Sequence, residues 1–193
     1  MEANFWHQKW QRGELGFHLD EANPHLVAHC AKLNLSVGSR VFLPLCGKTR
    51  DIAYLLNCGY QVVGAELSEL AIRDLFKELN LMPEVTALDG FLQFQAEDID
   101  IFVGDIFQLS PEMIGTVAAI YDRAALVALP VTMRRKYTAQ LIALSKVAPQ
   151  LLITYEYQQA LIDGPPFSIT EEEVKQHYAD TYQIQLLERV SVE

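Results

Sequence analysis

Short apolar runs alternate along the chain with longer segments of helical periodicity. The runs are bounded by turn residues and rich in branched and aromatic side chains, which is typical of buried strands. Alternation of this kind with short connections predicts parallel β-α-β units, wound right-handed into one sheet that helices cover on both faces. Strands are predicted at 40–45, 61–66, 99–103, 117–121, 151–157 and 184–190, and helices at 51–58, 68–79, 132–145 and 171–179.

Two further helices are predicted before the first strand. Trp6 and Trp10 are four residues apart within 5–14 and would share one face of a helix there. Pro24 stands just inside a second helix start, and apolar residues follow at helical spacing as far as Val37. The stretch 88–95 predicts an additional hairpin.

The composition fits a single domain over residues 1–193. Half of the residues are hydrophobic and 21% are charged, which supplies enough apolar material for one core. The 15 basic and 25 acidic residues give a net charge of −10, so binding to nucleic-acid phosphates is disfavoured. Each apolar stretch is broken by a charge or a turn before it could span a bilayer. We therefore expect no nucleic-acid or membrane partners. The chain is also expected to be a monomer.

The cysteines and the N-terminus favour a reducing compartment. Cys30, Cys46 and Cys58 are odd in number and form no C-x-x-C pair, which argues against a disulfide scaffold and a structural zinc site. Residues 1–16 carry charges throughout and lack the apolar core of a signal peptide. We expect a cytoplasmic protein without a metal site.

Candidate chemistry lies where the apolar runs end, because ligands of open parallel sheets bind beyond the carboxyl ends of the strands. Leu45-Cys46-Gly47-Lys48 follows the first run, and its glycine lets a ligand approach the backbone closely. Glu66 ends the second run about 20 residues later, where an acid accepts hydrogen bonds from ribose hydroxyls or, alternatively, stabilises a helix start. The turn is neither G-x-G-x-x-G nor a P-loop, so S-adenosylmethionine fits better than NAD.

The third and fourth strand ends carry an acid and an arginine. Asp105 could pair with the exocyclic amine of an adenine, with Ile106 and Phe107 in apolar contact; the alternative is an N-cap. Arg123 follows Asp122 where a cofactor carboxylate or an acidic substrate would lie, and arginine binds carboxylates with two hydrogen bonds. An ion pair with Asp122 is the alternative for Arg123.

Taken together, these residues resemble the thiopurine S-methyltransferase family, particularly its bacterial branch, over essentially the whole chain. The combination of PLCGK with VVGAELS is highly specific for that family among methyltransferases. The matching blocks are FWHQKWQRGELGFH (5–18), NPHL (23–26), VFLPLCGKTRDIAYLLNCGYQVVGAELSELAI (41–72), GDIF (104–107), YDRAALVALP (121–130) and ITYEYQQALIDGPPFSI (153–169).

The resemblance implies a Rossmann-like class I S-adenosylmethionine-dependent methyltransferase fold and transfer of a methyl group to the sulfur of aromatic or heterocyclic thiols such as 6-mercaptopurine. It also implies that residues 1–22 form a lid over the pocket. Cofactor contacts are implied at Trp10, Leu45, Glu66, Asp105, Ile106 and Arg123, and substrate contacts at Phe17 and Arg123.

Members of the family continue beyond the position that matches Glu193 with a further antiparallel strand. The C-terminal strand of the fold is therefore expected to be missing here, which would leave 184–190 without a ladder partner.

Several alternatives stay open at this point. The acceptor could be a selenium or tellurium compound, and a non-catalytic module that only binds S-adenosylmethionine is a third interpretation. His7, His18 and Asp20 could relay a proton, although lone histidines near a helix are more often structural. Cys46 is expected to be a small turn residue rather than a nucleophile.

Overall fold

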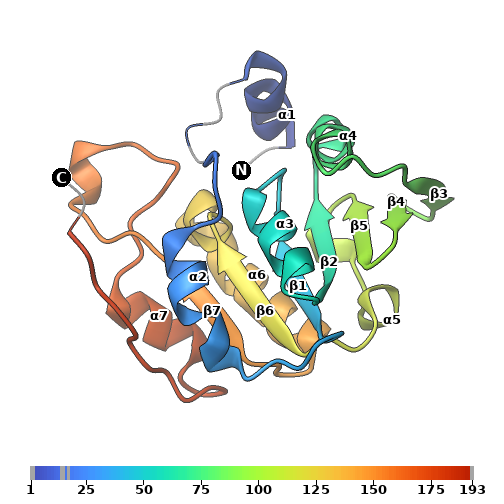
Figure 1. The fold of residues 1–193 in the computed structure, drawn as a ribbon. Coiled ribbons are helices and arrows are strands. Elements are labelled where there is room, and N and C mark those ends of the chain that lie inside the picture. Colours follow the sequence, from blue (N-terminus) through green and yellow to red (C-terminus); the bar gives the residue numbers. More distant parts are fainter. Residues whose placement is uncertain (1–2, 14–15, 17, 192–193) are drawn as a thin grey trace.

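The computed structural model describes residues 3–13, 16 and 18–191. In these residues seven strands form one sheet in the order β3-β4-β5-β2-β1-β6-β7 (Figure 1). Strands β5, β2, β1, β6 and β7 are parallel to one another, and β3 and β4 add an antiparallel edge next to β5. The strands are β1 (Arg40–Pro44), β2 (Gln61–Glu66), β3 (Glu84–Leu88), β4 (Phe91–Ala96), β5 (Ile99–Val103), β6 (Ala119–Arg123) and β7 (Gln150–Ile153).

Helices cover both faces of this sheet, as the alternating pattern predicts. Leu26, Ile52 and Ile72 belong to one buried cluster with one face of the strands, and Ile114, Tyr137 and Tyr178 to the cluster on the other. The helices are α1 (Ala3–Arg12), α2 (Pro24–His29), α3 (Arg50–Asn57), α4 (Glu69–Glu78), α5 (Pro111–Ile114), α6 (Val131–Ser145) and α7 (Glu171–Tyr178).

The order of the strands creates a switch point next to β1. The chain runs outward from β1 to β2 and β5, and then returns to place β6 on the other side of β1. At such a point the loops leave the carboxyl ends of neighbouring strands in opposite directions, which opens a crevice above the sheet. Figure 1 shows α1, in dark blue, above this end of the central strands.

Several element boundaries differ from the sequence-based prediction. The strand predicted at 117–121 is shifted to Ala119–Arg123, and the one predicted at 151–157 ends already at Ile153. The second helix ends at His29 and continues only as a 3-10 turn, Cys30–Leu33, which ends where Asn34 adopts a left-handed conformation with φ 51°. The hairpin predicted at 88–95 is confirmed, but its strands are β3 and β4, and β4 also pairs with β5.

The prediction of a strand at 184–190 is wrong, since this stretch has no regular secondary structure. Ile184, Leu186 and Val190 carry the apolar alternation of a strand, yet they are 41%, 60% and 55% exposed. A strand needs a neighbour that takes up its backbone hydrogen bonds, and among the described residues no strand pairs with this stretch. Within the same residues, no helix is long and apolar enough to cross a bilayer.

Asp122 is a fully buried carboxyl group at the end of β6. Its Oδ2 accepts a hydrogen bond from the Tyr137 hydroxyl at 2.8 Å, and its Oδ1 accepts one from the Leu126 amide at 3.1 Å. These bonds tie β6 to α6 and to the turn that follows the strand. Burial nevertheless raises the pKa of Asp122 from an ordinary 3.8 to about 6, because the charged form loses its hydration.

We predict that Asp122→Asn removes part of the pH dependence of stability. The folded state holds the Asp122 proton more tightly than the unfolded chain does, so this group's contribution to stability falls as pH rises from about 4 to about 6 and stays flat above. Asparagine keeps an acceptor and a donor for the same partners without a charge. The difference in unfolding free energy between variant and wild type should shift by up to about 3 kcal/mol across this range.

Urea unfolding followed by circular dichroism at a series of pH values measures this difference. Parallel stability curves for the two proteins would show that Asp122 does not titrate in this range.

Candidate active site

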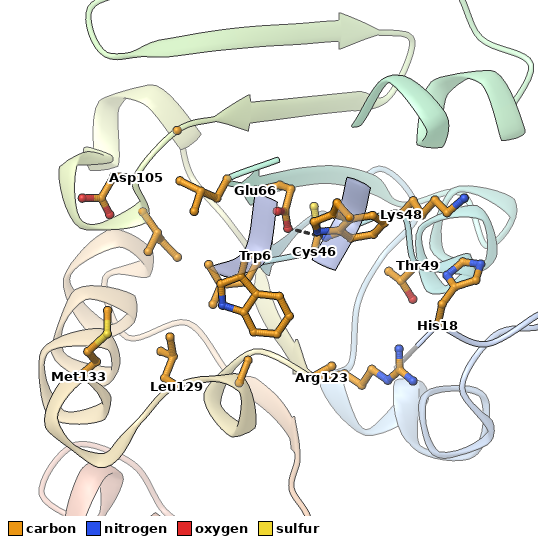
Figure 2. A pocket seen from close by; sticks show the side chains of 18 of the residues that line it. Trp6, His18, Cys46, Lys48, Thr49, Glu66, Asp105, Arg123, Leu129 and Met133 are labelled. Carbon is orange, nitrogen blue, oxygen red and sulfur yellow. Dashed lines mark hydrogen bonds between the residues drawn. The ribbon is translucent and has the colours of Figure 1, made fainter. Parts of the chain in front are cut away.

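A cavity of about 260 Å³ lies at the switch point, beyond the carboxyl ends of β1, β2, β5 and β6. Figure 2 shows it extending from Asp105 at one end to His18 at the other, with Glu66 and Arg123 on opposite sides. All six residues to which the family resemblance assigns cofactor contacts line it, and they come from separate segments of the chain. They are Trp10, Leu45, Glu66, Asp105, Ile106 and Arg123.

The Glu66 carboxylate joins two of these segments. Its Oε2 accepts a hydrogen bond from the Gly47 amide at 2.8 Å, drawn as a dashed line in Figure 2, and its Oε1 accepts one from the Ser68 amide at 2.9 Å. Burial raises the pKa of Glu66, and the amide donors act in the opposite direction. Glu66 therefore holds a helix start, as the alternative interpretation predicts, and it also lines the cavity. Its contact with ribose hydroxyls stays a prediction.

The turn after β1 is shaped by backbone conformation and by Trp10. Leu45 and Gly47 have φ of 48° and 53°, in the left-handed region that only glycine enters without strain. A Cβ on Gly47 would lie 2.9 Å from Cζ2 of the buried Trp10 ring, which places α1 directly on the turn. Strain at a non-glycine residue such as Leu45 is typical of ligand sites.

Asp105 and Ile106 form the wall beyond β5. Oδ1 of Asp105 accepts a hydrogen bond from the Phe107 amide at 3.0 Å, so the residue is the N-cap of the 3-10 turn Ile106–Gln108. Its Oδ2 has no hydrogen-bond partner among the described residues and can accept a bond from a ligand amine. Ile106 is 4% exposed and supplies an apolar surface beside it.

Arg123 is the cation with unused hydrogen-bonding capacity in the cavity wall. Its Nε is buried and has no hydrogen-bond partner within the described part of the chain. Such an orphan donor is costly unless a ligand satisfies it. The other lining cation, Lys48, is already engaged, with its Nζ 2.7 Å from Glu78 and 3.6 Å from Asp74. Asp122 accepts its hydrogen bonds from other groups, so the structure shows no Asp122–Arg123 ion pair in this part of the chain.

A second buried carboxylate lies at the start of α3, the helix that follows the turn. Asp51, at the start of α3, accepts hydrogen bonds from the Asn23 amide at 2.6 Å and from the Tyr121 hydroxyl at 3.0 Å. It thereby connects the residue before α2 and a residue of β6 to the helix that follows the Gly47 turn. Sequence reasoning did not single out Asp51, because its partners lie 28 and 70 residues away.

The histidines considered for a proton relay do not share one site. His18 lines the cavity, His7 lies in a separate hollow with Ser68, and Asp20 is exposed. Burial and the nearby Lys48 lower the pKa of His18, so its imidazole is neutral near pH 7 and able to accept a proton.

Burial raises the pKa of the Cys46 thiol well above its usual range, which agrees with a structural turn residue and not with a nucleophile. Phe17, to which the resemblance assigns a substrate contact, lies outside the described residues.

The apolar end of the cavity was missed by sequence reasoning. Ala128, Leu129 and Met133 line it from the turn after β6 and from α6. The only signal was the block YDRAALVALP, whose last residues were matched to the family without a role.

The fold and the site together define a class of protein. Solved structures of S-adenosylmethionine-dependent methyltransferases share this fold. A Burkholderia thailandensis 1,6-didemethyltoxoflavin-N1-methyltransferase superposes with a TM-score of 0.65 at 17% identity over 93% of this chain and 75% of that one. A TehB-like methyltransferase from Corynebacterium glutamicum gives 0.57 at 12% identity over 93% and 82% of the two chains. The predicted class I methyltransferase fold is thus confirmed.

Sequence comparison narrows the class to one family. Residues 1–193 match the thiopurine S-methyltransferase family throughout. Proteins of this name from Xanthobacter autotrophicus and Teredinibacter turnerae are each 50% identical over the whole of this chain and 91% and 89% of their own lengths. The chain therefore belongs to the thiopurine S-methyltransferase family, and S-adenosylmethionine is its cofactor.

We predict that Gly47→Ala lowers both stability and cofactor affinity. Alanine at this position combines a left-handed φ with a 2.9 Å contact to the Trp10 ring, so the turn or α1 must shift. The loss of stability should be about 1–3 kcal/mol. Urea unfolding and calorimetric titration with S-adenosylhomocysteine measure the two effects.

Gly38→Ala is the matched control, since Gly38 has φ 80° with nothing within 4 Å of an added Cβ. Equal effects of the two substitutions on ligand affinity would contradict the role assigned to the Trp10 contact.

Proposed function

We propose that this chain transfers the methyl group of S-adenosylmethionine to the sulfur of small aromatic or heterocyclic thiols such as 6-mercaptopurine. The observation that carries the proposal is the convergence on one cavity of the six residues that the family resemblance assigns to the cofactor, with a buried Arg123 Nε left without a partner among the described residues. Family membership supports the same reaction, because the relatives bear the name thiopurine S-methyltransferase.

The polar groups of the cavity suit the parts of the cofactor. Arg123 would bind the amino-acid carboxylate, since its Nε is an unpaired donor, whereas the other lining cation, Lys48, is already paired with Glu78. Glu66 has lone pairs left for ribose hydroxyls after accepting two amide bonds. The free Oδ2 of Asp105 and the Ile106 side chain would receive the adenine.

The acceptor would occupy the apolar end, against Leu129, Met133 and Trp6. Flat heterocycles bind such surfaces by contact area, with few polar groups needed to orient them. We propose α1 as the lid over this end, because both of its tryptophans line the cavity and Trp10 packs on the Gly47 turn. A closed lid excludes water from the reacting atoms.

The protein would contribute to the reaction mainly by positioning the acceptor sulfur and the cofactor methyl group. The cofactor supplies a methyl group on a sulfonium, which is already activated towards attack by a thiolate. Residues of this chain need to hold the acceptor sulfur in line with that methyl group and keep water out. Heterocyclic thiols ionise readily, so the reaction needs no dedicated base from the protein. His18 lies at the end of the cavity opposite Leu129 and Met133 (Figure 2), away from the proposed acceptor position.

We predict that Arg123→Ala and Glu66→Ala each weaken cofactor binding while the fold survives. Loss of a charge-assisted hydrogen bond should raise the dissociation constant about ten- to a hundredfold. Arg123→Lys should not restore it fully, because an ammonium cannot reproduce the geometry of the guanidinium. Calorimetric titration with S-adenosylmethionine gives the constants.

Arg135→Ala serves as the matched control, because Arg135 is an exposed cation on α6 outside the cavity. Normal binding by Arg123→Ala or Glu66→Ala would show that the role assigned to that residue is wrong.

A panel of acceptors tests the reaction itself. Release of S-adenosylhomocysteine is measured with 6-mercaptopurine, thiophenols, selenite and tellurite. We expect turnover with the aromatic thiols, reduced by Met133→Glu, because a carboxylate in the apolar end repels a thiolate. Turnover restricted to the selenium or tellurium compounds would replace the acceptor class, and tight cofactor binding without any turnover would indicate a sensor.

A further inference from the structure

Two histidines and a glutamate meet on the surface, outside the cavity. His25 and His29 are four residues apart on α2 and therefore lie on the same side of that helix. Glu188 comes from the stretch without regular structure after α7. Its Oε2 is 2.9 Å from Nδ1 of His25 and 2.9 Å from Nε2 of His29.

These three donor atoms have the composition and spacing of a metal site. They all lie within 4.8 Å of one another, one from each side chain. Two imidazoles with one carboxylate are a common ligand set for zinc and other divalent transition metals, whereas calcium and magnesium prefer oxygen alone. Tetrahedral zinc with bonds of about 2.0–2.2 Å keeps its ligand atoms about 3.4 Å apart. The carboxylate oxygen would withdraw by about 0.5 Å from each nitrogen, and the two nitrogens, which lie within 4.8 Å of each other, would adjust to the same spacing.

We propose that His25, His29 and Glu188 bind a divalent transition-metal ion, with zinc as the expected occupant. The side chains are 35%, 19% and 44% exposed, so an ion can enter directly from solvent and complete its coordination with water. Binding replaces the protons that the two imidazole nitrogens share with the carboxylate, because each ligand atom must offer a lone pair.

The structural consequence would be a cross-link between distant parts of the chain. Glu188 is 163 residues from His25 and 159 from His29. Among the described residues, no strand pairs with the segment 183–190, and the ion pairs of its Arg189 with Glu171 and Glu156 are exposed. Exposed ion pairs contribute little to stability. A bound ion would therefore be the main polar attachment of this segment to α2.

Zinc titration of the chain 1–193, with any affinity tag removed, tests the site directly. We expect one ion per chain in calorimetry, and a loss of affinity of more than about tenfold in His25→Gln/His29→Gln, because both nitrogen ligands are gone. Glu188→Gln provides a second variant that leaves α2 untouched. His177→Gln is the matched control, since His177 pairs with Glu173 at 3.4 Å without a second imidazole.

Cobalt(II) spectra and hydrogen exchange give readouts besides affinity. A thiolate ligand would add an intense near-ultraviolet charge-transfer band, so its absence would rule out binding at the cysteines. Zinc should slow amide exchange in 183–190 of the wild type and leave that of Glu188→Gln unchanged. The proposal is overturned if the wild type binds no zinc, if Glu188→Gln and the double variant bind it as tightly as wild type, or if the thiolate band appears.

Discussion

The buried carboxylate of Glu66 is the contact on which the geometry of the site depends. A carboxylate that is 6% exposed is stable only when hydrogen-bond donors replace its lost hydration. Here the amides of Gly47 and Ser68 supply them, which draws the turn after β1 against the tip of β2 and the start of α4. With the turn held there, the Trp10 ring packs on Gly47, and α1 lies above the strand ends.

Three consecutive side chains at the end of β6 contact different parts of the structure. Tyr121 donates its hydroxyl proton to Asp51 at the start of α3, and Asp122 accepts hydrogen bonds from Tyr137 of α6 and from the Leu126 amide. Alternation along a strand sends these two to opposite faces of the sheet. Arg123 comes last, at the carboxyl end, and its side chain lines the cavity. Both helical layers are thus anchored beside the arginine, which restricts where its guanidinium can lie.

Local pattern and strand topology together predict which residues meet at one edge of the sheet. Glu66, Asp105 and Arg123 each follow or end an apolar run, and parallel strands bring such positions to one edge of the sheet. Sequence reasoning failed at 184–190, whose alternation is that of a strand, because strand formation requires a partner that the pattern does not specify. It also missed Leu129 and Met133, since apolar residues after β6 look the same whether they face the core or a cavity.

The amino-acid sequence by itself determined the α/β class, the strand ends that carry polar chemistry and the family, because these depend on periodicity and on short, specific motifs. Only the tertiary structure decided which groups already have partners. It pairs Lys48 with Glu78, leaves Nε of Arg123 without a partner in the described residues, and brings Glu188 to His25 and His29. Hydrogen bonds between residues far apart in the chain have no counterpart in local sequence, since they exist only once the backbone is folded.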